Sequence, residues 1–181
     1  MYKLNITKNT LLLFLLVIGM GCQEYDPNLN KKGEDILEIN EVTENYVREI
    51  ELTHRDSIYI PIYSDIYSYN GQNKTLLTAT LSIRNTSIRD SLFIEDIIYY
   101  DSKGVLVRNY INGTLLLSPL QTIEYVIDHE DVAGGTGANF IVNWGANNPQ
   151  LKPIFQGIMI STKGQHGLSF VTEGISISER K

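Results

Sequence analysis

Hydrophobic and polar residues alternate with a period of two through most of the chain after residue 57. The clearest case is residues 77–84, where apolar side chains occupy the odd positions and Thr, Ser and Arg the even ones. This alternation predicts a strand with one buried and one solvent-exposed face. Similar strands are expected at residues 57–68, 93–100, 105–111, 114–117, 121–127, 140–144, 154–160 and 168–172.

Clusters of Asn, Asp, Gly and Pro separate these segments, and no helical periodicity intervenes between them. Short strands at regular spacing are typical of an antiparallel sandwich or barrel. We expect an all-β, immunoglobulin-like antiparallel β-sandwich over residues 57–181, because two aligned sheets accommodate about seven to nine strands in roughly 100 residues.

The start of the chain has the pattern of an export signal. Two lysines precede an unbroken apolar run at residues 11–18, and small residues follow it up to Cys22. The run is shorter than the roughly 20 residues that a membrane-spanning helix needs. We therefore interpret residues 1–21 as a signal peptide.

Cys22 is the only cysteine of the chain. Together with Gly21 it resembles the lipobox of bacterial lipoproteins, in which the cysteine sulfur receives a diacylglycerol and becomes the first residue after cleavage; Gly19 departs from the usual Leu or Val. The resemblance implies lipid attachment at Cys22 and a location in the bacterial cell envelope, anchored to a membrane. An ordinary secreted protein and an uncleaved anchor are the alternatives.

The segment after the cysteine is strongly acidic. Residues 23–56 contain ten acidic and four basic residues, a charge of −6 that accounts for the whole formal net charge of −6. Its first part is polar and lacks the apolar residues that a core requires. We expect an acidic tether over residues 22–56.

Several motifs, taken in order, resemble a bacterial domain-of-unknown-function family, number three-one-two-four. They lie at residues 60–64, 77–86, 99–101, 134–144 and 164–170, and the resemblance covers about residues 59–170. The resemblance implies an exported, uncharacterised lipoprotein and no particular reaction, cofactor or catalytic residue.

Composition and charge exclude some functions. The acidic balance argues against nucleic acid as a partner, since phosphate binding needs a basic surface. The three histidines are scattered, and no pattern of metal ligands or of a nucleophile with its base occurs. We therefore expect no enzyme activity, no cofactor and no metal.

Two stretches are candidate binding residues. On one uninterrupted strand Tyr59, Tyr63, Tyr67 and Tyr69 would share a face and form an aromatic platform; the alternative is a set of tyrosines at the rim of the sandwich. The glycine-rich loop that contains Gly134, Gly135, Gly137 and Asn139 has two interpretations. Its backbone N–H groups could converge on a ligand, or its glycines could serve a tight connection with positive φ angles.

These observations predict a non-catalytic binding module for an envelope protein or glycan, with loops or a sheet edge away from the tether as the binding surface. The alternative is a structural or assembly component of an envelope complex, which would expose a large apolar patch.

Overall fold

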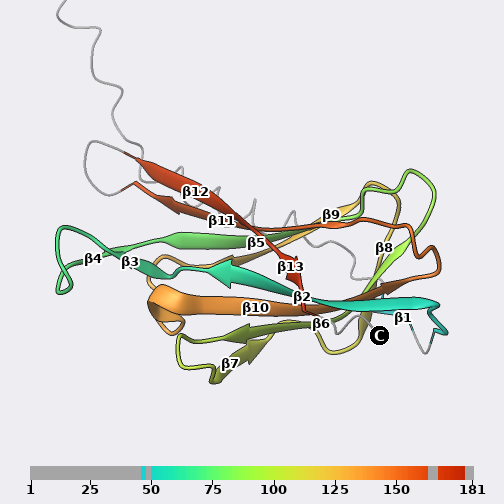
Figure 1. Ribbon diagram of the computed structural model, residues 1–181, viewed down its shortest axis with the longest axis horizontal. Helices are drawn as coiled ribbons and strands as arrows, with labels where there is room; N and C mark the ends of the chain where they lie inside the picture. The colour runs from blue at the N-terminus through green and yellow to red at the C-terminus, as the bar shows by residue number, and fades with distance from the viewer. Residues whose placement is uncertain (1–45, 48–49, 163–166, 178–181) are drawn as a thin grey trace, which may run out of the picture. The chain divides into compact units, whose positions relative to one another are not determined.

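The computed structural model describes residues 46–47, 50–162 and 167–177, which consist almost wholly of antiparallel strands (Figure 1). The chain divides into two units, residues 1–41 and 42–181, and all described residues belong to the second. The predicted signal peptide, Cys22 and most of the predicted tether therefore lie outside the described residues. Within the described part, no helix is long and apolar enough to cross a membrane.

The larger sheet has seven strands in the order β1-β8-β6-β10-β2-β13, with β7 beside β6. Its strands are β1 (Tyr46–Val47), β2 (His54–Ile62), β6 (Leu92–Tyr100), β7 (Leu106–Asn109), β8 (Thr114–Leu117), β10 (Ala138–Ala146) and β13 (Ile175–Ser176).

The smaller sheet has four strands in the order β12-β11-β5-β9. They are β5 (Thr78–Arg84), β9 (Thr122–Ile127), β11 (Ile154–Ser161) and β12 (Leu168–Glu173). A separate hairpin consists of β3 (Asp65–Tyr67) and β4 (Lys74–Leu76), and the short 3₁₀-helix η2 spans Gly135–Gly137.

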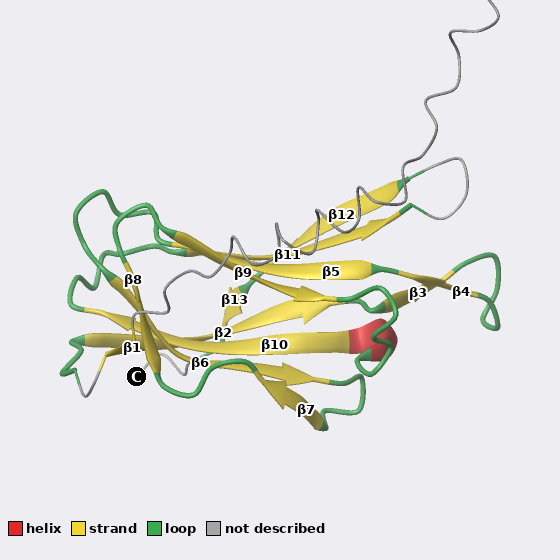
Figure 2. Ribbon diagram, turned by 180° about the vertical axis from the view of Figure 1, so that it is seen from behind, coloured by secondary structure: helices red, strands yellow, loops and turns green. Residues whose placement is uncertain are grey.

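The two sheets form two layers that pack face to face (Figure 2). Successive long strands alternate between them: β5 lies in the smaller sheet, β6 in the larger, β9 in the smaller and β10 in the larger. The predicted all-β, immunoglobulin-like antiparallel sandwich is confirmed in its main feature, two packed antiparallel sheets.

The period-two pattern explains which side chains form the core. Ala79, Leu81 and Ile83 of β5 are fully buried, as are Phe140 and Val142 of β10. Their neighbours along each strand lie on the outward faces. The core between the layers is therefore built from alternate residues of both sheets.

The chain passes from one sheet to the other at Gly174. β12 pairs with β11 in the smaller sheet, and β13 pairs with β2 in the larger one. A Cβ atom on Gly174 would lie 2.5 Å from Cγ2 of Ile58, so only glycine lets the backbone approach this closely. The crossing closes one edge of the sandwich.

Some of the described strand residues lie upstream of the predicted domain boundary at residue 57. Tyr46 and Val47 pair with β8, and β2 begins at His54. Arg55 and Asp56, which the charge pattern places in the tether, are therefore residues of the larger sheet.

The two ends of the sandwich differ. In Figures 1 and 2, β1 lies at one end, whereas the β3–β4 hairpin and η2 lie at the opposite end. The described chain therefore enters at one end and presents this hairpin at the other.

Candidate functional site

A groove of about 490 Å³ crosses the outward face of the larger sheet, where β2, β10 and β6 lie side by side. The residues that line it are all polar: Arg55, Asp56, Ser57, Glu95, Asp96 and Asn143. The strand register explains this arrangement, because Asn143 of β10 stands opposite both Ser57 of β2 and Asp96 of β6.

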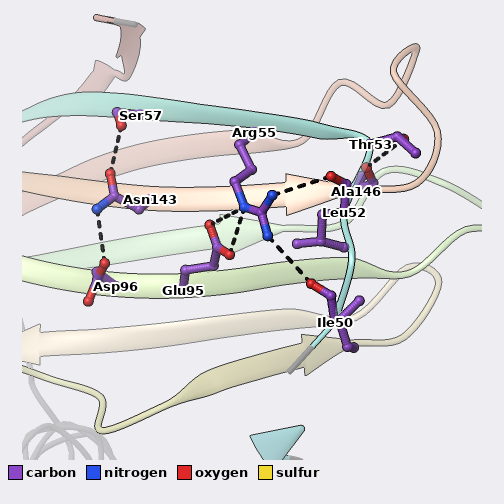
Figure 3. Close-up of polar contacts among 9 residues, drawn as sticks. All are labelled: Ile50, Leu52, Thr53, Arg55, Ser57, Glu95, Asp96, Asn143 and Ala146. Atoms are coloured by element: carbon purple, nitrogen blue, oxygen red, sulfur yellow. Dashed lines mark hydrogen bonds and ion pairs between the residues drawn. The ribbon is translucent and has the colours of Figure 1, made fainter. Parts of the chain in front are cut away.

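Hydrogen bonds connect the three strands across the groove (Figure 3). The hydroxyl of Ser57 donates to Oδ1 of Asn143 over 2.7 Å, and Nδ2 of Asn143 donates to Oδ2 of Asp96 over 3.0 Å. These two bonds fix the orientation of the Asn143 amide and of the carboxylate, so the groove is formed before any ligand arrives.

Arg55 closes one end of the groove. Its Nε donates to both carboxylate oxygens of Glu95, over 3.0 and 3.2 Å. Its terminal nitrogens donate to the carbonyl oxygens of Leu52 and Ile50 (Figure 3). A shift in the β10–β6 register leaves Glu95 without a partner on β10, and this bulge lets Glu95 reach Arg55.

The groove is acidic. Three acidic residues and one arginine line it, and Arg55 pairs with Glu95 alone among them. Oδ1 of Asp56 accepts hydrogen bonds from the backbone N–H of Ser57 and from the hydroxyl of Ser176, both over 2.8 Å. The excess of negative charge favours neutral or cationic ligands over anionic ones.

A row of hydrogen bonds links Ser57, Asn143 and Asp96 in the order of a catalytic triad, but the row lacks a general base. A nucleophilic serine needs a neighbour that accepts its proton, usually a histidine. The amide of Asn143 occupies that position, and an amide is no base at neutral pH. The arrangement can hold hydroxyl and amide groups of a ligand by hydrogen bonds.

An apolar row lies directly beside the polar one on the same face. Tyr59 is two residues from Ser57 on β2, and the register places it opposite Ile175 of β13 and Ile141 of β10. Ile141 in turn stands opposite Ile98 of β6. The face therefore offers one aromatic ring and several aliphatic side chains next to the polar groove.

The glycine-rich loop is a tight connection whose polar groups bind within the protein. The carbonyl of Gly134 accepts hydrogen bonds from N–H and Oγ of Ser102, and the N–H of Gly137 donates to Oγ of Ser102. Gly135 alone among the loop glycines has a positive φ, +73°. Asn139 lies on β10 opposite Pro61 and Tyr100. The loop's polar contacts are therefore made within the protein, and one of its glycines, rather than several, has a positive φ.

Gly134 packs against a buried tyrosine. The Tyr99 ring is fully buried, and its hydroxyl lies 2.9 Å from Oγ of Ser64. Burial raises the pKa of Tyr99 above 10.0, and burial also raises the pKa of the nearby Tyr110. Because the folded state holds both protons more tightly than the unfolded chain, these two tyrosines do not affect stability at neutral pH and lower it as the pH rises above 10.

The four tyrosines do not share one strand face. β2 ends at Ile62 and the chain bends at Ser64, before β3 begins at Asp65. Tyr63 packs edge-on against Phe170, with ring centroids 5.7 Å apart. Tyr59 lies beside the groove, whereas Tyr67 and Tyr69 lie on the β3–β4 hairpin, so the structure separates the predicted platform into three places.

The sequence interpretation missed the groove residues. Asp96 and Asn143 are polar residues inside otherwise apolar strands, and this is the signal that could have found them. The charge pattern places Arg55 and Asp56 in the tether, whereas both are residues of β2. Of the predicted site residues, only Tyr59 lies next to the groove.

The sequence also predicts no metal site and a lipid-attachment site at Cys22. Within residues 46–47, 50–162 and 167–177, no three His, Cys, Asp or Glu side chains lie close enough together to hold a metal ion. Cys22, the expected site of lipid attachment, is outside those residues.

Fold and groove together define an antiparallel β-sandwich domain with an open polar groove on its larger sheet. The chain belongs to the family described as "Protein of unknown function (DUF3124)", whose model matches residues 55–177. This confirms the resemblance seen in the sequence, and the match begins at Arg55, the first groove residue.

No curated protein matches the chain. Among solved structures, the crystal structure of Thermotoga maritima 1070 is similar at 15% sequence identity, covering 68% of this chain and 96% of that chain with a TM-score of 0.39. A similarity at this level supports no conclusion about fold or function.

Proposed function

We propose that the chain is a non-catalytic binding module of the bacterial cell envelope, attached to a membrane by lipid at Cys22, and that it binds a neutral or amino glycan on the outward face of the larger sheet. The observation that carries the proposal is the preformed polar groove beside Tyr59. The membrane attachment rests on the lipobox pattern alone.

Saccharides present hydroxyl groups that both donate and accept hydrogen bonds, together with apolar ring faces. The groove supplies a carboxylate acceptor in Asp96 and an amide in Asn143. Tyr59 supplies an aromatic ring one step along the same strand face, where a sugar ring could stack. The negative charge of the groove disfavours uronic, sulfated and phosphorylated sugars.

The first prediction concerns the groove. On an array of neutral, amino and acidic oligosaccharides, the full chain is expected to bind neutral or amino members. Asp96→Asn and Tyr59→Ala are each expected to weaken this binding about tenfold, because loss of one good polar or stacking contact costs about 1.4 kcal/mol. Asp96→Asn keeps the side-chain shape, so its melting temperature should stay close to that of the wild type.

Glu124→Gln is the matched control, because Glu124 is an exposed carboxylate on the smaller sheet that accepts a hydrogen bond from Ser82. It should leave glycan binding unchanged. Equal loss of binding in all three variants, preference for acidic sugars, or no bound array member would refute the glycan proposal.

The second prediction concerns the anchor. Cys22→Ser is expected to abolish incorporation of radioactive palmitate and to remove the protein from the lipid-modified membrane fraction, because each buried methylene of an acyl chain contributes about 0.8 kcal/mol to membrane attachment. Gln23→Ser, one residue downstream, serves as the control and should label normally. Palmitate labelling that persists in Cys22→Ser would rule out acylation at this residue.

A further inference from the structure

The β3–β4 hairpin presents two tyrosines that the fold leaves uncovered. Tyr69 is 103% exposed relative to a fully accessible residue, and Tyr67 is 57% exposed. The Tyr67 ring contacts the ammonium group of Lys74, whose Nζ lies 5.3 Å from the ring centroid. Burial of these rings therefore contributes little to folding.

Tyr69 is also held in an unfavourable backbone conformation. Its φ is +63°, in the left-handed region that non-glycine residues rarely adopt. Glycine at this position would be less strained, and no described residue packs over the ring to offset the strain. Strain of this kind at an exposed residue points to a role outside folding.

Hydrogen bonds and an ion pair hold the backbone of the hairpin. Oδ1 of Asn70 accepts hydrogen bonds from the backbone N–H groups of Gln72 and Asn73, over 2.9 and 3.0 Å, and the N–H of Ser68 donates to the carbonyl of Asn73 over 2.8 Å. At its base, the buried Asp65 carboxylate pairs with Lys74 over 3.0 Å. The backbone that carries the two exposed rings is therefore already ordered, which lowers the entropy cost of binding.

The chemistry of the hairpin tip fits a protein partner better than a glycan or a lipid surface. Residues 68–73 are Ser, Tyr, Asn, Gly, Gln and Asn; all are uncharged, and all except Gln72 are of the types enriched in antibody binding loops. Small ligands and sugars bind in concave sites, whereas the hairpin tip projects from the domain, so it is poorly suited to them. A projecting ring becomes buried only when the partner supplies the pocket.

We propose that Tyr69, together with Tyr67, inserts into an uncharged pocket on a partner protein in the envelope, at the end of the sandwich opposite β1 (Figure 1). This site is separate from the groove on the larger sheet, so the module has two recognition surfaces. Because Lys74 and Asp65 neutralise each other, the interaction is expected to be insensitive to salt.

The test uses the full chain in the cells that produce it. Tyr69→p-benzoylphenylalanine places a photo-crosslinking aromatic side chain at the tip, and Lys103→p-benzoylphenylalanine places the same group on the exposed β6–β7 turn as a control. Irradiation is expected to give one discrete protein adduct from residue 69 and none from residue 103. Adding Tyr67→Ala should reduce the adduct roughly tenfold, as expected for an aromatic anchor.

Asp96→Asn in the same chain should leave the adduct from residue 69 unchanged. Failure of the glycan proposal and failure of the hairpin proposal are therefore distinguishable. Tyr69→Gly is expected to raise the melting temperature, because it relieves the strained φ. In a chain that carries the photo-crosslinker at residue 67, Tyr69→Gly is expected to abolish the adduct. An adduct of equal strength from residue 103, an adduct to glycan or lipid, no adduct at residue 69, or insensitivity to Tyr67→Ala would overturn the proposal.

Discussion

Gly134→Ala is expected to destabilise the domain by about 3 kcal/mol, the sum of overpacking and of a strained or broken buried hydrogen bond. A Cβ atom at residue 134 would lie 1.8 Å from the hydroxyl oxygen of Tyr99 and 2.7 Å from Cβ of Ala138. The Tyr99 ring cannot move away easily, because it is fully buried and packs against Phe140 with ring centroids 5.0 Å apart.

The measurement is the urea midpoint of unfolding, which should fall at an unchanged slope. Gly137→Ala is the matched control in the same loop, since its nearest contact would be Oγ of Ser102 at 3.5 Å and its φ is not in the left-handed region. A loss of less than 1 kcal/mol for Gly134→Ala, or equal losses for the two variants, would show that this contact is not what requires glycine.

Asn85→Ala is expected to cost about 2 to 3 kcal/mol, because it removes three hydrogen bonds that a buried side chain donates to backbone carbonyls. Asn85 is 2% exposed, and its Nδ2 donates to the carbonyls of Asp90, Leu117 and Ser118 over 2.8, 3.1 and 3.0 Å. This one amide connects the end of β5 to the segments that flank β6 and β8.

Chemical denaturation measures the loss, with Thr86→Ala as the neighbouring control. Thr86 is exposed and its hydroxyl donates to the carbonyl of Lys152 over 2.7 Å, so its removal should cost no more than about 1 kcal/mol. If Asn85→Ala were no more destabilising than Thr86→Ala, the amide would not be a structural link between these segments.

Strand positions could be predicted from the sequence because burial on one face imposes a period of two. The segment at residues 77–84 illustrates this, since β5 spans Thr78–Arg84 and its alternate residues are fully buried. The bend at Ser64 could not be placed in the same way. It depends on the N–H of Ser64 donating to the carbonyl of Gly135 over 3.1 Å, a contact between segments far apart in the sequence.

The groove was harder to predict for a related reason. Ser57, Asp96 and Asn143 are separated by about 40 residues or more along the chain, and only the strand order β2, β10, β6 brings them into one row. A single sequence does not specify which strands are neighbours. The glycine loop was conspicuous in the sequence, but its polar groups bind Ser102 and Ser64.

The measurement that tests the glycan proposal most directly is a map of backbone amide chemical shifts in the full chain during titration with the tightest-binding member of the oligosaccharide array. The proposal predicts shifts confined to the groove and its apolar neighbours, at residues 55–59, 95–98 and 141–143. Shifts centred on residues 67–73 instead, or the absence of any array member that binds, would contradict it.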